Sequence, residues 1–200
     1  MNILAVADIE DNYIWDYFDK EKFKDVDLII SCGDLKASYL EFLATMIPAP
    51  LLYVPGNHDE SYEANPPGGC INIDGNIYIA KNGARIFGLG GSIKYRPNRL
   101  HQYTEEEMKR RISKSSRIIK KAGGIDIFVS HSPAFGIGDG KDLAHTGFKC
   151  FVGLMDKYSP KWFLHGHQHR SYDRKILRKH IYKNTEIINT GPYYLFKYGE

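Results

Sequence analysis

The stretch LLYVPGNHD, residues 51–59, joins a short apolar run to a turn that is rich in polar groups. An apolar run without polar alternation is typical of a strand buried on both faces, as in the parallel sheet of a layered α/β protein. Pro55 and Gly56 end this run, and Asn57, His58 and Asp59 follow at once. The stretch therefore predicts a buried strand whose carboxyl end presents an amide, an imidazole and a carboxylate.

The same arrangement recurs four more times along the chain. Apolar runs at 2–7, 26–31, 125–130 and 162–164 are followed in turn by Asp8 and Glu10, by Asp34, by His131, and by His165, His167 and His169. The carboxyl ends of parallel strands converge on one rim of a sheet, where ligands bind. A single polar residue at a strand end is usually a cap or a turn residue. Five in the same position instead favour a divalent metal site of carboxylates, an amide oxygen and imidazoles.

The order of the elements indicates a layered α/β fold. Helical patterns at 12–22 and 36–47 separate the first three strands, and this β-α-β-α-β order predicts a parallel sheet with right-handed crossovers. Shorter strands follow near 71–73, 77–80 and 84–89, which suggest hairpins, and a closing series lies near 172–177, 180–183, 186–190 and 193–198. No linker or repeat interrupts the chain, so residues 1–200 are predicted to form one domain with a mixed sheet or two packed sheets.

A long helix is predicted from 104 to 122. Thr104 and Glu107 form a capping-box pattern at its start, and Gly123 and Gly124 end it. The helix carries seven cationic residues: Lys109, Arg110, Arg111, Lys114, Arg117, Lys120 and Lys121. Such a run is either a solvated face or a surface for a polyanion, and both interpretations stay open.

Composition narrows the class of protein. The 200 residues have a net charge of +3, which by itself is too small to indicate that the protein binds nucleic acid. No apolar run approaches the length of a membrane span, and Asp8 follows the first apolar run too soon for a signal peptide. The three cysteines, Cys32, Cys70 and Cys150, include no CxxC pair, which favours reduced thiols in a cytoplasmic protein.

Four motifs in order resemble those of the calcineurin-like metallophosphoesterases. They are GD at 33–34, GNHD at 56–59, SH at 130–131 and GHQH at 166–169. The resemblance covers nearly the whole chain, because Asn189-Thr190-Gly191 looks like the closing N-x-G turn of the family. It implies a four-layer αββα sandwich of two mixed β-sheets flanked by helices, and a metal-dependent hydrolase acting on phosphoric ester bonds.

The resemblance also implies a role for each matching residue. One divalent ion would be held by Asp8, residue 10 and His169, and a second by Asn57, His131 and His167, while Asp34 would bridge the two. A hydroxide held between the ions would attack phosphorus. His58 would contact the phosphate and assist the leaving group, and Asp59 would orient the ring of His58.

Residue 10 departs from the family, which usually has histidine there. Glu10 is then a direct ligand, the holder of a metal-bound water, or the sign of a weakened first metal site. Strand alternation would point Asp8 and Glu10 the same way and Asp11 the opposite way. If Glu10 is a direct ligand, its negative charge predicts a preference for Mn²⁺, with Fe, Zn, Ni or Mg as alternatives, and an alkaline pH optimum.

Two loops are candidates for substrate binding. Arg96 and Arg99 lie in the segment 90–103, and His145 lies in the glycine-rich segment 132–148. The arginines hold a phosphate or belong to an exposed connection, and His145 touches substrate or caps the next helix. The wording of 131–147 looks like a branch of the family that acts on cyclic nucleotides, so a small phosphodiester or nucleotide is the expected substrate. The alternatives are a nuclease of the same family, with nucleic acid as a less favoured partner, or a non-catalytic, metal-stabilised binding protein.

Overall fold

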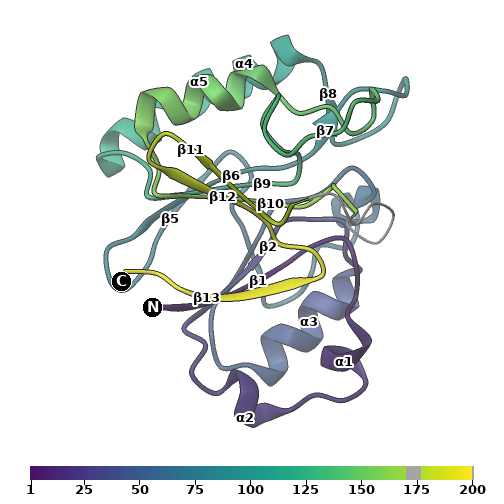
Figure 1. Ribbon diagram of the computed structural model, residues 1–200. Helices are drawn as coiled ribbons and strands as arrows, with labels where there is room; N and C mark the ends of the chain where they lie inside the picture. Colours follow the sequence, from purple (N-terminus) through teal and green to yellow (C-terminus); the bar gives the residue numbers. More distant parts are fainter. Residues whose placement is uncertain (170–176, 200) are drawn as a thin grey trace.

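The computed structural model describes residues 1–169 and 177–199, and two β-sheets form its centre (Figure 1). The first sheet has the strand order β13 (Tyr193–Lys197), β1 (Asn2–Val6), β2 (Leu28–Ser31), β3 (Leu51–Tyr53) and β4 (Ile71–Asn72). The second has the order β11 (Lys179–Tyr182), β12 (Thr185–Asn189), β10 (Trp162–His165), β9 (Ile127–Ser130), β6 (Arg85–Leu89) and β5 (Ile77–Ile79). A small parallel pair, β7 (Ser92–Ile93) and β8 (Gln102–Tyr103), lies apart from both.

Helices cover the outer face of each sheet (Figure 1). The first sheet packs on α1 (Asn12–Trp15), α2 (Lys20–Phe23) and α3 (Ala37–Met46), and a short 3₁₀ helix, η1 (Glu60–Glu63), follows the third strand. The second sheet packs on α4 (Glu105–Ala122) and α5 (Lys149–Tyr158). A third apolar cluster lies between the sheets. The predicted four-layer αββα sandwich is therefore confirmed.

The continuous apolar runs reflect burial on both faces of the first sheet. Ile30 and Leu52 point into the core between the sheets, whereas Ile29 and Leu51 point toward α3, and all four are fully buried. Burial of each such side chain stabilises the fold by about 1.5–3 kcal/mol. Strands β1, β2 and β3 pair in parallel, as the order of elements predicted.

Two local predictions were wrong. The chain forms α1 and α2 in place of one helix over 12–22, because Asp11 caps the first and Asp19 caps the second with their side-chain oxygens. Strand β4 pairs in parallel with β3 and forms no hairpin with β5. The hairpin of β5 with β6 is present, and the capping box at Thr104 is confirmed.

Most of the strand predicted at 172–177 lies outside the described residues. Among the residues that are described, no helix is both long and apolar enough to cross a membrane.

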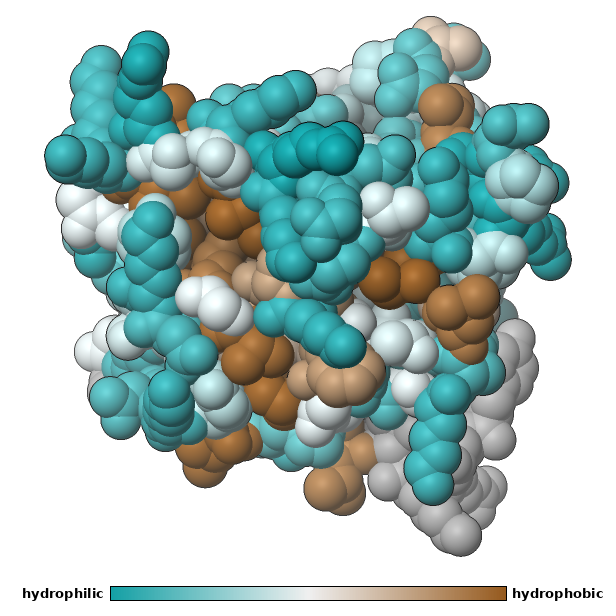
Figure 2. Space-filling view, turned by 90° about the horizontal axis from the view of Figure 1, so that it is seen from above, coloured by the Kyte–Doolittle hydropathy of each residue, from teal (hydrophilic) through white to brown (hydrophobic). Residues whose placement is uncertain are grey.

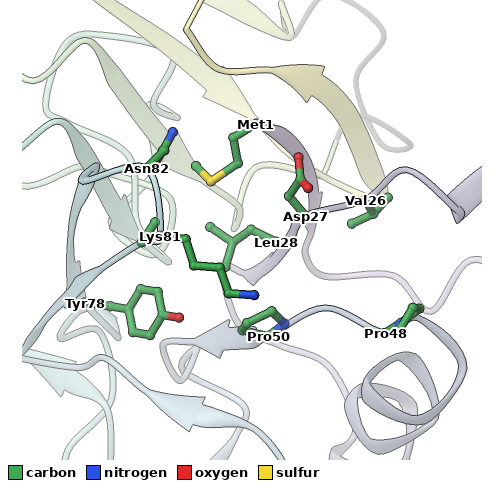
Figure 3. A pocket seen from close by; sticks show the side chains of 10 residues that line it. Met1, Val26, Asp27, Leu28, Pro48, Pro50, Tyr78, Lys81 and Asn82 are labelled. Carbon is green, nitrogen blue, oxygen red and sulfur yellow. The ribbon is translucent and has the colours of Figure 1, made fainter.

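A cavity of about 380 Å³ opens at the amino ends of β2 and β3, beside the turn from β5 to β6 (Figure 3). Leu28, Pro50, Tyr78 and Lys81 lie around it. None of the site residues predicted from the sequence lines this cavity. The predicted metal ligands follow the opposite, carboxyl ends of the strands.

Candidate metal centre

Residues from both sheets meet at the carboxyl ends of the strands. Asn57 follows β3 in the first sheet, and His131 and His167 follow β9 and β10 in the second. His131 Nε2 lies 3.0 Å from the Asn57 side-chain oxygen and 3.0 Å from His167 Nδ1. Asp34, which follows β2, places Oδ2 at 3.3 Å from the same nitrogen. The structure thus brings together four of the residues predicted as ligands.

The backbone fixes which nitrogen of each ring carries a proton. His131 Nδ1 lies 2.8 Å from the carbonyl of Cys32, and His167 Nε2 lies 2.6 Å from the carbonyl of Ala144. A carbonyl only accepts, so both of these nitrogens donate. The remaining nitrogens, His131 Nε2 and His167 Nδ1, then direct their lone pairs toward each other and toward two oxygen acceptors. Such a group of facing acceptors requires a cation or a shared proton at its centre.

The ionisation of the cluster shows the same need for positive charge. Burial lowers the pKa of His131, but the charge and hydrogen bond of Asp34 outweigh it and raise the pKa to about 9. Burial opposes ionisation of Asp34, yet the charge of His131 carries the pKa of Asp34 below its ordinary range. Burial and the charge of His131 lower the pKa of His167 to about 3. The surroundings of His131 therefore favour positive charge at this ring.

Three residues of the predicted ligand set adopt a left-handed backbone. The φ angles are 66° at Asp8, 56° at Asp34 and 68° at His167. Residues other than glycine rarely adopt this conformation, which costs of order 1–3 kcal/mol each and clusters at functional sites. Burial raises the pKa of Asp8 to about 7. Its two carboxylate oxygens each lie 2.9 Å from the backbone nitrogen of His167, which links the two sheets across the rim.

Asp59 holds two turns of the first sheet together. Its Oδ2 accepts from the backbone N–H groups of Asp34 and Gly56, each at 2.7 Å. The contact expected between Asp59 and the ring of His58 is absent among the described residues. A Cβ atom at Gly56 would collide with the carboxylate of Asp34, so glycine is required there. Burial, followed by the charge of Asp34, raises the pKa of Asp59 to about 6.

Glu10 faces Lys36. Its Oε1 accepts from the backbone N–H of Lys36 at 3.1 Å, and its Oε2 accepts from Nζ of the same lysine at 3.0 Å. Strand alternation does not apply to Asp8 and Glu10, because β1 ends at Val6 and Asp8 already has a left-handed backbone. Asp11 instead caps α1. Glu10 nevertheless lines a hollow of about 200 Å³ together with Asp34, Lys36 and His58.

His58 also lines a second, smaller hollow. It measures about 80 Å³, and its lining includes Asn57, Arg96 and Arg99 as well as His58. The Arg99 guanidinium pairs with Glu60 at 3.0 Å, whereas that of Arg96 lies 5.5 Å from the ring centre of Tyr95. His58 itself is exposed, and its backbone N–H donates to Asp34 Oδ1 at 2.8 Å. The two predicted arginines thus lie beside the cluster.

The loops of the second sheet support the histidines. His145 Nδ1 lies 2.9 Å from the carboxylate of Asp142, and the His145 ring lies 5.3 Å from that of His167. His169 is half-buried, which lowers its pKa, and the charge of Asp34 opposes this effect. Asn189 of the N-x-G turn donates to the carbonyl of Gln168 at 2.7 Å.

Three contributors to this site were not predicted from the sequence. They are Lys36 and the backbone carbonyls of Cys32 and Ala144. Lys36 carries no local sequence signal for such a contact. A backbone carbonyl is present at every position and is recognised only in the folded loop.

The residues present fit a divalent cation. Ligand atoms of Asp34, His131 and His167 all lie within 4.8 Å of one another, and Asn57 adds an amide oxygen beside them. A carboxylate, an amide oxygen and two imidazole nitrogens form a mixed oxygen and nitrogen set that suits Mn²⁺, Fe or Zn²⁺. In each histidine, one ring nitrogen donates to a backbone carbonyl and so fixes the orientation of the ring. The other ring nitrogen then directs its lone pair toward the ion.

Comparisons with known proteins agree with this geometry. The sequence model of the calcineurin-like phosphoesterases matches residues 1–171. The uncharacterized protein MJ1162 of Methanocaldococcus jannaschii is 29% identical over 191 residues, which cover 88% of this chain and 83% of that protein.

Solved structures share the fold. The crystal structure of TT1561 of Thermus thermophilus has a TM-score of 0.66 at 17% identity and covers 95% of this chain and 88% of its own. Another crystal structure has a TM-score of 0.70 at 14% identity and covers 97% of this chain and 93% of its own.

Proposed function

The chain belongs to the calcineurin-like phosphoesterase family, and from this premise we propose that it hydrolyses phosphodiesters with two divalent cations, preferably Mn²⁺. The observation that carries the proposal is the pair of facing lone pairs on His131 Nε2 and His167 Nδ1, 3.0 Å apart and next to Asn57. When bound, divalent cations supply an activated water and neutralise charge on the phosphoryl oxygens.

The residues of the chain divide the remaining work. Asn57, His131 and His167 would hold one cation, and Asp8, Glu10 and His169 would hold the other. Asp34 would serve both, because a carboxylate offers one oxygen to each cation. Asp34, Asn57 and His167 already lie next to His131. Little reorganisation of these side chains is therefore needed when charge develops on the phosphate.

His58 acts on the leaving group. Its backbone is held by Asp34 while its ring is exposed, so the ring reaches a bound phosphate. As an imidazolium it stabilises charge on the phosphoryl oxygens and donates a proton to the departing oxygen. Arg96 adds a second positive group from the neighbouring hollow.

The surroundings of His58 favour a diester over a monoester. His58 lines both the hollow of about 200 Å³ and the hollow of about 80 Å³. A phosphate at His58 would therefore lie next to both hollows, and the two substituents of a diester would occupy one each. A monoester would leave one of the two hollows empty.

The test is hydrolysis of bis-p-nitrophenyl phosphate by metal-stripped protein to which Mn²⁺ is returned. We expect turnover that depends on the metal and that His58→Ala reduces about 10²- to 10⁴-fold, since this variant removes a general acid. Tyr17→Ala changes an exposed ring outside both hollows and serves as the control. The same assay with p-nitrophenyl phosphate measures the preference for diesters. No turnover with Mn²⁺, Fe, Zn²⁺, Ni²⁺ or Mg²⁺ would instead favour a metal-stabilised binding protein.

A further inference from the structure

Positive charge is concentrated on one helix of this protein. Residues 108–122 hold seven of the 27 lysines and arginines and no carboxylate. Since the whole chain has a net charge of +3, the rest of the chain is net negative. The helix dipole accounts for cations in the last turn, such as Lys120 and Lys121, but not for those in earlier turns. An ordinary solvated helix face mixes both signs of charge.

Four of these cations form a stripe, which we define as Arg110, Lys114, Arg117 and Lys121. Their spacing of four, three and four residues places them on the same face of α4. All four side chains are exposed, and in the described part of the chain none of them makes a hydrogen bond or an ion pair. At 1.5 Å per residue the stripe is about 16 Å long.

Two other cations of α4, Lys109 and Arg111, differ from the stripe because they have carboxylate partners. Lys109 pairs with Glu106 at 2.8 Å. Arg111 pairs with Asp74 and donates to the carbonyl of Gly90 at 2.9 Å, which anchors the helix to the fold. The charge of Arg110 helps to lower the pKa of Glu106, after the larger effects of the hydrogen bond and charge of Lys109. No ion pair or hydrogen bond holds the four stripe residues in the described part of the chain, so their charge is available to a ligand.

A broad hollow continues the stripe at the ends of α4 and α5. It measures about 740 Å³ and is lined by Arg117, Lys120, Lys157 and the ring of Tyr158, together with Gly123 and Gly124. No carboxylate lines it among the described residues. Lys157 Nζ lies 5.0 Å from the ring centre of Tyr158. Figure 2 shows the molecule from the side of α4 and α5, where hydrophilic side chains cover much of the surface and hydrophobic ones lie between them.

We propose that the stripe and this hollow bind a single-stranded nucleic acid. Regularly spaced cations match the repeated phosphates of its backbone, and the Tyr158 ring offers a face on which a base stacks. A membrane surface fits less well, because a membrane-binding helix exposes apolar residues beside its cations. The apolar residues Met108 and Ile119 of α4 are instead fully buried in the core.

The binding assay is fluorescence anisotropy with a labelled oligothymidylate long enough to span the stripe. The protein carries His58→Ala, so that neither cleavage nor its absence affects the result. We expect a variant with all four stripe residues changed to Gln to bind at least about tenfold more weakly at low salt. The slope of log K against log salt should become shallower by about 0.7 for each phosphate that the variant no longer neutralises, or about 3 in total.

A matched control separates the stripe from general charge. The variant with Lys20, Lys24, Lys81 and Lys179 changed to Gln removes four exposed cations from other elements. We expect its affinity to stay within about twofold of the parent, since distant surface charges are screened. Tyr158→Leu should weaken binding about five- to tenfold by removing one stacked base.

Two results would overturn the proposal. One is equal loss of affinity in the stripe variant and in the control variant. The other is binding to vesicles that contain phosphatidylserine without binding to the oligonucleotide, which would identify a membrane-facing surface. Far-UV circular dichroism of each variant shows whether the fold is kept. The phosphodiester assay is separate, so either proposal can fail while the other stands.

Discussion

Lys36 competes with any metal ion for the carboxylate of Glu10. The lysine occupies both oxygens, through its backbone N–H and its Nζ. If Glu10 is a ligand of the first metal site, Lys36→Met should raise the affinity for the second Mn²⁺ bound. An exposed ion pair contributes about 0.2–1 kcal/mol, so the gain should be about 1.4- to 5-fold. Calorimetric titration of the metal-stripped protein with Mn²⁺ measures both affinities.

Lys24→Met provides the matched control for this prediction. It breaks another exposed lysine–glutamate pair, in which Lys24 Nζ lies 2.9 Å from Glu21. Both Mn²⁺ affinities should stay unchanged in this variant. Unchanged second-site affinity in Lys36→Met would show that Glu10 does not bind metal directly.

The sequence predicted which residues lie close together in the candidate metal centre, but it did not predict how their side chains are oriented. Asp34, Asn57 and His131 each follow a buried strand, and the carboxyl ends of such strands must converge. In contrast, the contact of Lys36 with Glu10 joins residues 26 positions apart through a long exposed side chain. No local pattern encodes such a contact, because several rotamers of lysine are equally accessible in an unfolded chain.

At the scale of the elements, one ion pair fixes the start of two parallel strands. Asp126 Oδ2 accepts from the backbone N–H and the Nε of Arg85, at 2.8 and 2.7 Å. The next residues, Ile86 and Ile127, are the first register pair of β6 and β9. The hydrogen bond and the charge of Arg85 lower the pKa of Asp126. The ion pair thus aligns β6 with β9, and His131 follows directly after the end of β9.

Asp126→Asn should lower the free energy of unfolding by about 1.5–3 kcal/mol at neutral pH, the range for a hydrogen bond to a charged group. Because the folded pKa lies below the unfolded value, this stability is present above the unfolded pKa of about 3.9 and is lost as pH falls through the folded pKa. The difference between variant and parent should therefore shrink in acid. Urea unfolding at neutral and acidic pH measures it, with the exposed Asp25→Asn as control. A difference that grows in acid would contradict this assignment.

Strands with continuous apolar sequences and the long capped helix were predictable, whereas the places where a helix or strand is interrupted were not. The apolar strands and the helix from Thr104 follow from periodicity and capping, which act within a few residues. The break between α1 and α2 depends on Asp19 acting as a cap and not as an exposed helix residue, and both roles suit aspartate. The early end of β1 depends on the left-handed backbone of Asp8, which tertiary contacts impose.

At the scale of the whole molecule, the candidate metal centre is a junction between the two sheets. Asp34 and Asn57 belong to the first sheet, and His131 and His167 belong to the second. Below this junction the sheets are held by apolar packing, in which Ile30 and Val129 take part. A cation at the rim would therefore add a further tie between two layers that already meet through their core, their strand connections and rim hydrogen bonds such as that of the His167 backbone with Asp8.

This junction predicts that metal stabilises the whole fold and not only the loops. A ligand at about one hundred times its Kd adds about 2.7 kcal/mol to the free energy of unfolding. For a chain of this size each kcal/mol shifts Tm by about 2–4 °C, so Mn²⁺ should raise Tm by about 5–10 °C over the metal-stripped protein. Calorimetry with Mn²⁺ and with EDTA measures the shift. His131→Gln should abolish it, because the lone pair of Nε2 is lost, whereas Lys24→Met should keep it. A shift that survives in His131→Gln would place the metal elsewhere, since no cation could then bridge the sheets through this ring.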